Sequence, residues 1–422
     1  MSSQALRHGA WMLLWIVCEG LAAAPPALPG LDLAGAVRRS LETHPELAVR
    51  EAEQRVQAGV QTQAGLRPNP ELSLEIEDVL GSGARRGFDA AQTTLSLRQV
   101  LERGAREQRL AVAAATSGQF EAALAERRVQ LAADTAQRFH QVLAEQALLE
   151  LSREAVQLAG QGVEAAARRV QAAQVPAAEL ARAQAQAARA RLEQEDVEHR
   201  LEVARYRLAA SWGAGAPDFG EALGALQTLP PAVEFAALQS ALEASPGLQR
   251  FLAERALREA ERQQLLQQRR PAWTLSAGLR RFEDGDDLAA VAGLSLPLGL
   301  RDPVAGQLAS AEARLDQLEA ERAAARVEWQ SQLYAWVQEL AHARHVAETL
   351  DHEVLPALQA ALEETERAYR RGRYGYAEWL AAQRELLEAR RARIEAALDA
   401  HRSATDIDRL TAARPALPDP RP

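Results

Sequence analysis

The chain has 422 residues, a formal net charge of -9 and one cysteine; 47% of its residues are hydrophobic but only 5% are aromatic. This length exceeds one compact core and predicts several substructures, and an apolar share made mostly of Ala and Leu favours long helices. The acidic balance argues against nucleic acid as a partner, since no basic surface could offset the phosphate charge.

The first 24 residues have the pattern of a secretory signal peptide. Arg7 precedes a short apolar run over residues 11–18, and three alanines at 22–24 stand before Pro25. Cys18 lies inside this segment, so the mature chain is expected to lack cysteine, which excludes disulfides and thiolate metal sites. No later stretch is apolar enough for a transmembrane helix, so entry into a membrane would have to use β-strands.

The rest of the chain contains two copies of one pattern, offset by roughly 200 residues. Residues 41–47 (LETHPEL) return as residues 242–248 (LEASPGL), and residues 176–180 (PAAEL) return as residues 375–379 (GYAEW). Similarity that keeps its order along the chain indicates a repeated unit. Each unit is predicted to run helix, strand, strand, long helix, turn, long helix.

A pair of amphipathic strands is expected in each unit. Leu72, Leu74 and Ile76 alternate with polar residues, which is typical of a sheet with one apolar face. The expected strands lie near residues 71–79, 91–100, 272–282 and 288–298. Strands of about ten residues suit a tilted crossing of a bilayer, but four strands leave edges that lipid cannot solvate. Three chains sharing about twelve strands could close a barrel; the alternative is a soluble four-stranded sheet on a helical body.

Two long helical hairpins account for most of the chain. Apolar residues recur every seven positions, as at Val142, Leu149 and Val156 in the first hairpin and at Leu333 and Leu340 in the second. Heptads sustained over this length predict coiled-coil packing. In the second hairpin, Pro356 should bend the helix or interrupt its hydrogen bonding.

These signals divide the chain into eight segments. The expected segments are a signal peptide (1–24), N-terminal and equatorial helices (25–70), strands 1 and 2 (71–100), the first long hairpin (101–212), a linker with equatorial helices (213–270), strands 3 and 4 (271–300), the second long hairpin (301–413) and a disordered tail (414–422). The fold class is therefore mainly α with a small β part.

Over residues 31–410 the chain resembles the TolC-like outer-membrane efflux proteins, and within them the heavy-metal cation (CzcC-type) branch. The resemblance is carried by residues 67–77 (RPNPELSLEIE), 92–97 (QTTLSL), 101–104 (LERG), 353–356 (EVLP) and 368–372 (AYRRG). It implies a homotrimer in the outer membrane of a Gram-negative bacterium that extends into the periplasm, with an α-barrel of long helices below a twelve-stranded β-barrel. It also implies a periplasmic adaptor and an inner-membrane pump of the resistance-nodulation-division class as partners, and no cofactor.

Charged and aromatic residues gather at the two hairpin turns. Glu179 and Glu378 occupy equivalent positions just past the turns, where a trimer would present a ring of carboxylates that concentrates cations. The alternative is that both are ordinary acids of a first helical turn. The resemblance implies that Tyr369 and Glu378, with a neighbouring arginine, form the gate. The remaining candidates for the pore or gate are Arg370, Arg373 and Tyr374.

The same turns are the expected docking points for adaptor hairpins, because exposed apolar or aromatic groups at a turn usually need a partner. The candidates are Val175, Pro176, Gly372, Gly375 and Tyr376, and the alternative for Tyr376 is that it folds back on its own helix.

The sequence favours a channel over an enzyme, since it has no nucleophile-elbow, phosphate-loop or zinc-protease motif. His342 and His345 have a spacing that could chelate a metal, but surface histidines on a coiled coil are the simpler interpretation. Three alternatives stay open. The same fold could serve drug efflux or type I protein secretion, or the chain could be a periplasmic adaptor or a coiled-coil protein without a pore.

Overall fold

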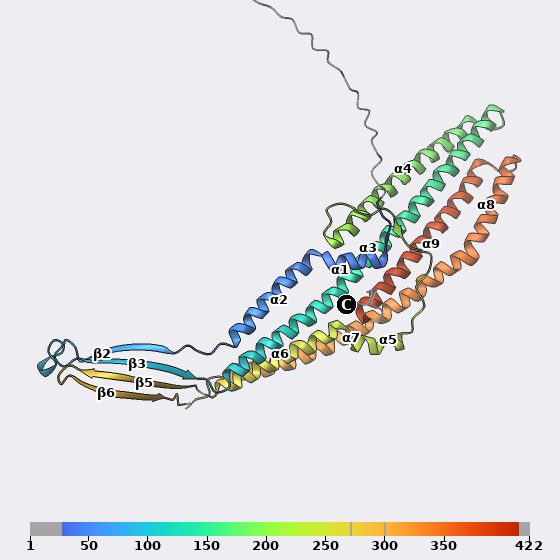
Figure 1. Ribbon diagram of the computed structural model, residues 1–422. Helices are drawn as coiled ribbons and strands as arrows, with labels where there is room; N and C mark the ends of the chain where they lie inside the picture. The colour runs from blue at the N-terminus through green and yellow to red at the C-terminus, as the bar shows by residue number, and fades with distance from the viewer. Residues whose placement is uncertain (1–27, 271, 299–300, 413–422) are drawn as a thin grey trace, which may run out of the picture.

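The computed structural model describes residues 28–270, 272–298 and 301–412. They form one elongated body with a sheet at one end and two helical hairpins at the other (Figure 1). The predicted signal peptide with Cys18, and the predicted tail over residues 414–422, lie outside the described residues. Among the described helices, none combines the length and the apolar character that crossing a membrane requires.

The sheet joins the strand pairs of both repeated units. Its strands are β2 (Glu71–Glu77), β3 (Gln92–Leu101), β5 (Trp273–Phe282) and β6 (Asp287–Ser295). They are antiparallel in the order β2-β3-β5-β6, so the two units meet where β3 pairs with β5. The outer strands β2 and β6 each have one unpaired edge within the described chain.

One face of this sheet is apolar and the other is polar, as the alternation predicted. One cross-strand row consists of Leu74, Leu95, Leu279 and Ala290, and the next row consists of Glu75, Thr94, Arg280 and Ala289. The apolar side chains are left uncovered, and Leu74 is 63% exposed. A continuous apolar face of this kind marks a surface that meets lipid or another protein.

The observed strand ends differ from the expected ones for local backbone reasons. β2 stops at Glu77, two residues early, because Asp78 adopts a left-handed conformation with φ 56. β6 stops at Ser295, three residues early, close to Pro297, which has no N–H for the ladder. The first long helix begins only after Gly104, whose φ of 86 turns the chain from strand to helix.

Helices make up the rest of the body. Those of the first unit are α1 (Leu33–Thr43), α2 (Pro45–Ala64), α3 (Ala105–Gln171) and α4 (Ala177–Ala209). Those of the second unit are α5 (Phe235–Glu243), α6 (Pro246–Gln268), α7 (Ala305–Thr349), α8 (Leu355–Arg370) and α9 (Tyr376–Thr411). Proline in the first turn, after a capping His44 or Ser245, starts both α2 and α6, so the repeated motif marks equivalent helix starts.

The helices lie side by side in a fixed lateral order. Nearer the sheet, α2 packs on α3, α3 on α6 and α6 on α7; nearer the hairpin tips, α4 packs on α3, α3 on α9 and α9 on α8. One lateral edge therefore consists of β2, α2 and α4, and the other of β6, α7 and α8. Both edges expose apolar side chains, among them Val56 on α2, Leu192 on α4 and Val327 on α7.

The predicted heptad stripes form the core around the middle of the body. In the first unit Val142 is buried with Phe139, Leu208 and Trp212, where α3 meets α4 and α9. In the second unit the stripe residues Leu333 and Leu340 are buried against Leu242 and Leu248. Two short strands, β1 (Leu31–Asp32) and β4 (Ala222–Leu223), pair in parallel beside the first cluster.

The second long helix is interrupted, as Pro356 predicted. A π-helical turn over Leu350–Val354 separates α7 from α8, whereas α3 runs through its full length without a break. Proline cannot donate the backbone hydrogen bond to the carbonyl four residues earlier, and the wider turn accommodates this loss.

Candidate functional site

The two hairpin turns lie together at the end of the body opposite the sheet (Figure 1). Both turns place one residue in the left-handed region at equivalent positions, Ala173 with φ 54 and Gly372 with φ 75. The chain then re-enters a helix at Ala177 in the first unit and at Tyr376 in the second. The turns are therefore built alike, although their side chains differ.

An aromatic cluster from the second hairpin packs against the first. The ring of Tyr369, at the end of α8, stacks on Trp379 with centroids 4.9 Å apart, and Tyr376 meets both rings at steep angles. All three rings are buried, Tyr369 at 1% exposure and Tyr376 at 3%. The cluster includes Ala166 and Ala183, whose small side chains let the aromatic rings approach α3 and α4.

One polar link crosses between the hairpins inside this cluster. The Tyr369 hydroxyl donates a hydrogen bond of 2.9 Å to the Glu179 carboxylate on α4. The Arg169 guanidinium on α3 lies 3.6 Å from the same carboxylate and 4.6 Å from the centroid of the Tyr369 ring. A carboxylate held by a tyrosine and an arginine therefore joins two segments that are 190 positions apart in the chain.

The protonation state of the tyrosines suits this arrangement. Burial raises the pKa of the Tyr369 hydroxyl, and burial also raises the pKa of Tyr376. Both hydroxyls therefore keep their protons at physiological pH, and Tyr369 remains a hydrogen-bond donor to Glu179.

Glu378 does not take part in this link, although it is equivalent to Glu179. Its side chain is exposed, and no hydrogen bond or ion pair to it occurs among the described residues. The reason lies in the repeat. The positions equivalent to Tyr369 and Arg169 are Val170 and Ala368, which have no polar side chain to offer. Within one chain the Tyr369 hydroxyl therefore pairs with Glu179 and not with Glu378, and the gate formed by Tyr369, Glu378 and a neighbouring arginine stays a prediction.

The other expected pore residues surround the second turn. Arg370 points outward and pairs with Glu366 of its own helix at 2.5 Å. Arg373 is exposed, and Tyr374 is 49% exposed. These side chains are available on the surface of the turn, whereas Tyr369 is not.

Among the docking candidates, Pro176, Gly372 and Gly375 are exposed and Val175 is half-buried. The expectation that Tyr376 is an exposed docking residue is wrong, because its ring is buried between the hairpins. Gly162 on α3 makes room for it: a Cβ there would lie 3.3 Å from the ring and its hydroxyl oxygen.

Sequence reasoning missed Arg169 and Trp379. Arg169 is one of many arginines on α3, and nothing in its sequence neighbourhood distinguishes it. Trp379 stands where the first unit has Leu180, so the larger ring of the second copy was a signal that this hairpin buries more area at its tip.

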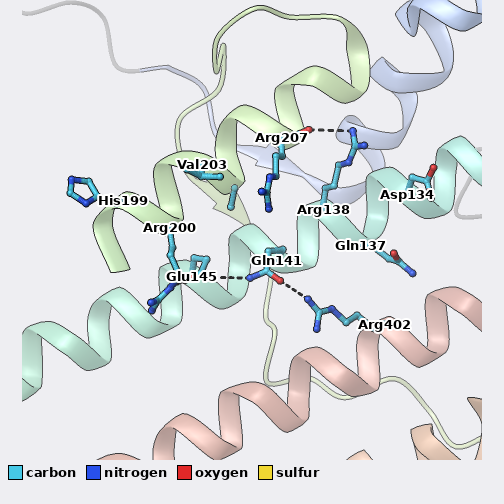
Figure 2. A pocket seen from close by; sticks show the side chains of 11 residues that line it. Asp134, Gln137, Arg138, Gln141, Glu145, His199, Arg200, Val203, Arg207 and Arg402 are labelled. Carbon is cyan, nitrogen blue, oxygen red and sulfur yellow. Dashed lines mark hydrogen bonds and ion pairs between the residues drawn. The ribbon is translucent and has the colours of Figure 1, made fainter. Parts of the chain in front are cut away.

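A second concave region, between α3, α4 and α9, is polar (Figure 2). Gln141 and Arg200 donate hydrogen bonds of 2.7 Å and 3.2 Å to the buried Glu145 carboxylate, and Arg402 donates one of 2.7 Å to Gln141. This chain of bonds links α9 to α3 and α4. These bonds connect the two repeated units. The residues that form them do not place a nucleophile beside a base.

The described residues include no group of three or more His, Cys, Asp or Glu side chains that could hold a metal ion. His342 and His345 are exposed on α7. They are two neighbouring histidines with no third ligand converging on them from the described part of the chain.

Solved structures share this architecture. The outer-membrane channel OprN superposes with a TM-score of 0.74 at 19% sequence identity, covering 90% of this chain and 90% of OprN. The outer membrane protein VceC of Vibrio cholerae superposes with a TM-score of 0.70 at 19% identity, covering 89% of this chain and 94% of VceC. The fold is thus that of the TolC-type outer-membrane channels.

Sequence similarity assigns the chain to one branch of these outer-membrane channels. The cobalt-zinc-cadmium resistance protein CzcC of Cupriavidus metallidurans is 30% identical over 351 residues, which are 82% of each chain. No protein-family model matches the sequence. The chain belongs to the CzcC-type outer-membrane efflux proteins. It is a channel component of the Gram-negative outer membrane that extends into the periplasm, and it is not an enzyme.

Proposed function

We propose that three copies of this chain join side by side into one exit duct. The two lateral edges support this arrangement. Each edge ends in an unpaired strand and an apolar helix face, and the edges are different surfaces, so contact between copies is heterologous and generates a ring. In lipid, unpaired strand edges are costly, and pairing β6 of one copy with β2 of the next removes them.

The polar face of the sheet suits the inside of such a duct. Arg280 pairs with Glu77 at 3.0 Å, and Arg98 lies 3.8 Å from Glu71, so charges on this face are paired across strands. The apolar face, with Leu74 and Leu279, then meets the lipid. The alternation of apolar and polar side chains along the strands therefore fits a barrel with an aqueous lumen inside and hydrocarbon outside.

Cysteine crosslinking tests the ring, because the mature chain is expected to contain no other thiol. Ser73→Cys on β2 is combined in turn with a cysteine at 289, 291 or 293 on β6. At least one pair is expected to give disulfide-linked dimers and trimers on non-reducing gels, and nothing larger. The control is Ser73→Cys with Ser96→Cys, which face each other within one chain and should stay monomeric. Monomers throughout, or an open ladder of higher oligomers, would contradict the ring.

We further propose that the duct carries heavy-metal cations, delivered by a resistance-nodulation-division pump through a periplasmic adaptor. The similarity to a cobalt-zinc-cadmium resistance protein supports this substrate class. Deletion of the gene is expected to lower tolerance to cobalt, zinc and cadmium and to leave drug tolerance unchanged. Loss of drug tolerance alone would favour the drug-efflux alternative.

The hairpin tips are proposed as the closed periplasmic mouth. The link between Tyr369, Glu179 and Arg169 holds the second hairpin to the first, and Glu378 with Arg373 supplies free charge at the opening. The exposed turn residues Pro176, Gly372, Tyr374 and Gly375, with Val175, are the proposed contact points for the adaptor. Substitution of Glu378 by Ala tests the mouth: unchanged conductance and cation selectivity would remove Glu378 from this role.

A further inference from the structure

The junction between the sheet and the helices carries a surplus of arginine charge. Glu102, one residue beyond β3, accepts a bidentate contact from Arg109. This hydrogen bonding lowers the pKa of Glu102, and the charges of Arg109, Arg106 and Arg67 lower it further. Arg109 contacts this carboxylate and the charges of Arg106 and Arg67 also act on it, so arginine is in excess over Glu102 at the junction.

Two of the junction arginines are not neutralised locally. Arg67 and Arg103 are exposed, and no carboxylate lies within ion-pair distance of either among the described residues. Arg103 instead places its guanidinium 4.9 Å from the ring centroid of Trp273, at the first residue of β5. Trp273 faces Leu101 in the register and shares a side of the sheet with Leu275, so this arginine lies at the base of the apolar face.

The loop that carries Arg67 lies on the same side. Gln99, which is in the row of Leu275, donates a hydrogen bond of 3.2 Å to the carbonyl of Pro68. Next to this loop, a groove of ≈ 620 Å³ runs between α2 and α3. Its walls include apolar side chains together with the charged groups, namely Val60, Leu66, Val112, Arg67, Glu102 and Arg109.

We propose that this junction binds an anionic phospholipid of the inner leaflet, with the phosphate between Arg67 and Arg103 and an acyl chain along the groove and the apolar face. The proposal rests on the sheet lying in the outer membrane. Charge complementarity supports it, since an excess of guanidinium groups beside an uncovered apolar surface matches an anion that carries a hydrocarbon chain. Tryptophan at the boundary of the apolar face suits the headgroup level.

The test is native mass spectrometry of the full-length trimer in detergent, titrated with dioleoyl phosphatidylglycerol or with dioleoyl phosphatidylcholine. Phosphatidylglycerol is expected to bind preferentially. The double variant R67Q/R103Q should lose that preference, by about fivefold for each arginine removed. R67K/R103K keeps the charge and should keep most of the preference. R182Q/R189Q removes two exposed arginines from α4, far from the sheet, and should behave like the unmodified protein.

Three outcomes would overturn the inference. One is equal binding of the two lipids by the unmodified protein, as would result if a second copy covered the groove. Another is retention of the preference in R67Q/R103Q. The third is displacement of the lipid by millimolar inorganic phosphate, which would make the junction a site for the free ion. Bilayer conductance of the same samples distinguishes failure of the lipid proposal from failure of the channel proposal. A protein that conducts ions but shows no lipid preference contradicts only the lipid site.

Discussion

The hydrogen bond from Tyr369 to Glu179 is a buried polar contact that ties the second hairpin to the first at the proposed mouth. Tyr369→Phe keeps the stacking on Trp379 and removes only the hydroxyl. A hydrogen bond to a charged group contributes about 1.5–3 kcal/mol, so the closed state should weaken by about tenfold or more. We expect higher conductance in planar bilayers.

The matched control is Tyr206→Phe, which removes a hydroxyl from an exposed tyrosine of α4 outside the turns. It should leave conductance unchanged. Equal effects from both substitutions would mean that the link at Tyr369 does not hold the mouth closed.

Gly160 and Gly162 are both inside α3, yet a methyl group would meet different surroundings at each. A Cβ at Gly160 meets nothing within 4 Å, whereas a Cβ at Gly162 meets the ring of Tyr376 at 3.3 Å. Gly160→Ala should stabilise the trimer by up to about 1 kcal/mol through helix propensity. Gly162→Ala should gain less or lose stability because the ring must move. The temperature of trimer dissociation measures both, and equal gains would contradict the proposed packing of Tyr376.

Among single residues, the sequence pointed to Tyr369 at the second turn but not to its contacts with Glu179, Arg169 and Trp379. Glu179 and Glu378 are equivalent by repeat, and only the structure shows that Tyr369 reaches the first of them. The two glutamates differ in the residues that face them from the other hairpin. A heptad pattern does not specify those contacts, so the sequence could not show which glutamate Tyr369 bonds. Tyr376 looked like an exposed turn residue because its pocket depends on a glycine from the other repeated unit.

Among the helices, the π-helical turn before Pro356 carries an ion pair between the exposed Asp351 and the buried Arg393 of α9. The Arg393 guanidinium donates hydrogen bonds to Asp351 at 2.7 Å and to the carbonyl of Gln227 at 3.3 Å. Asp351→Ala would leave this arginine, whose side chain is only 8% exposed, without its counter-charge. We expect a loss of about 2–3 kcal/mol in the free energy of unfolding.

The comparison is Asp399→Ala, which breaks an exposed pair with Arg402 on α9. Exposed pairs contribute about 0–1 kcal/mol, so this variant should unfold almost like the unmodified chain. Thermal denaturation of the two variants side by side decides whether the turn depends on its ion pair.

The contact between α3 and α9 contains two stacked histidines, with ring centroids of His140 and His401 4.5 Å apart. Burial lowers the pKa of His140 to about 3, and the charge of His401 acts in the same direction. An unfolded chain binds this proton near pH 6.5, so stability is complete above that value and falls as the pH decreases toward 3. Between pH 7.5 and 5.5 the expected loss is about 1.4 kcal/mol per chain.

His140→Leu should reduce this pH dependence, and His342→Leu, which removes an exposed histidine, should not. Chemical denaturation at several pH values measures it. An unchanged slope in His140→Leu would assign the acid sensitivity to another group, such as His401, whose pKa burial also lowers.

The elements themselves were largely predictable. Alternating side chains and heptads have short periods that a sequence displays directly, so the four strands and both hairpins were located to within a few residues. The ends depended on single backbone conformations, such as the left-handed Asp78. The lateral order of the helices depends on packing between distant parts of the chain. The repeat does not indicate which helix of one unit packs on which helix of the other.

The whole molecule combines two similar units into an asymmetric pair. The first unit contributes an unbroken α3, and the second contributes the interrupted α7–α8 segment and the larger aromatic residues at the tip. Placed in a ring, such pairs would alternate a hairpin with an unbroken α3 and a hairpin that contains a π-helical turn. In the proposed duct, a gate would move one of these two sets of hairpins against the other.

The membrane placement of the whole body depends on which face of the sheet meets lipid. Leu74→Arg puts a charge on the apolar face in the middle of β2, and Ser73→Arg puts the same charge on the neighbouring position of the polar face. An arginine facing hydrocarbon near the bilayer midplane costs about 2–4 kcal/mol, and a trimer would bear this cost three times. Leu74→Arg is therefore expected to abolish heat-sensitive trimers in the outer-membrane fraction, whereas Ser73→Arg should retain them. If Ser73→Arg were the variant that failed to assemble, the lumen and the lipid would have to exchange sides.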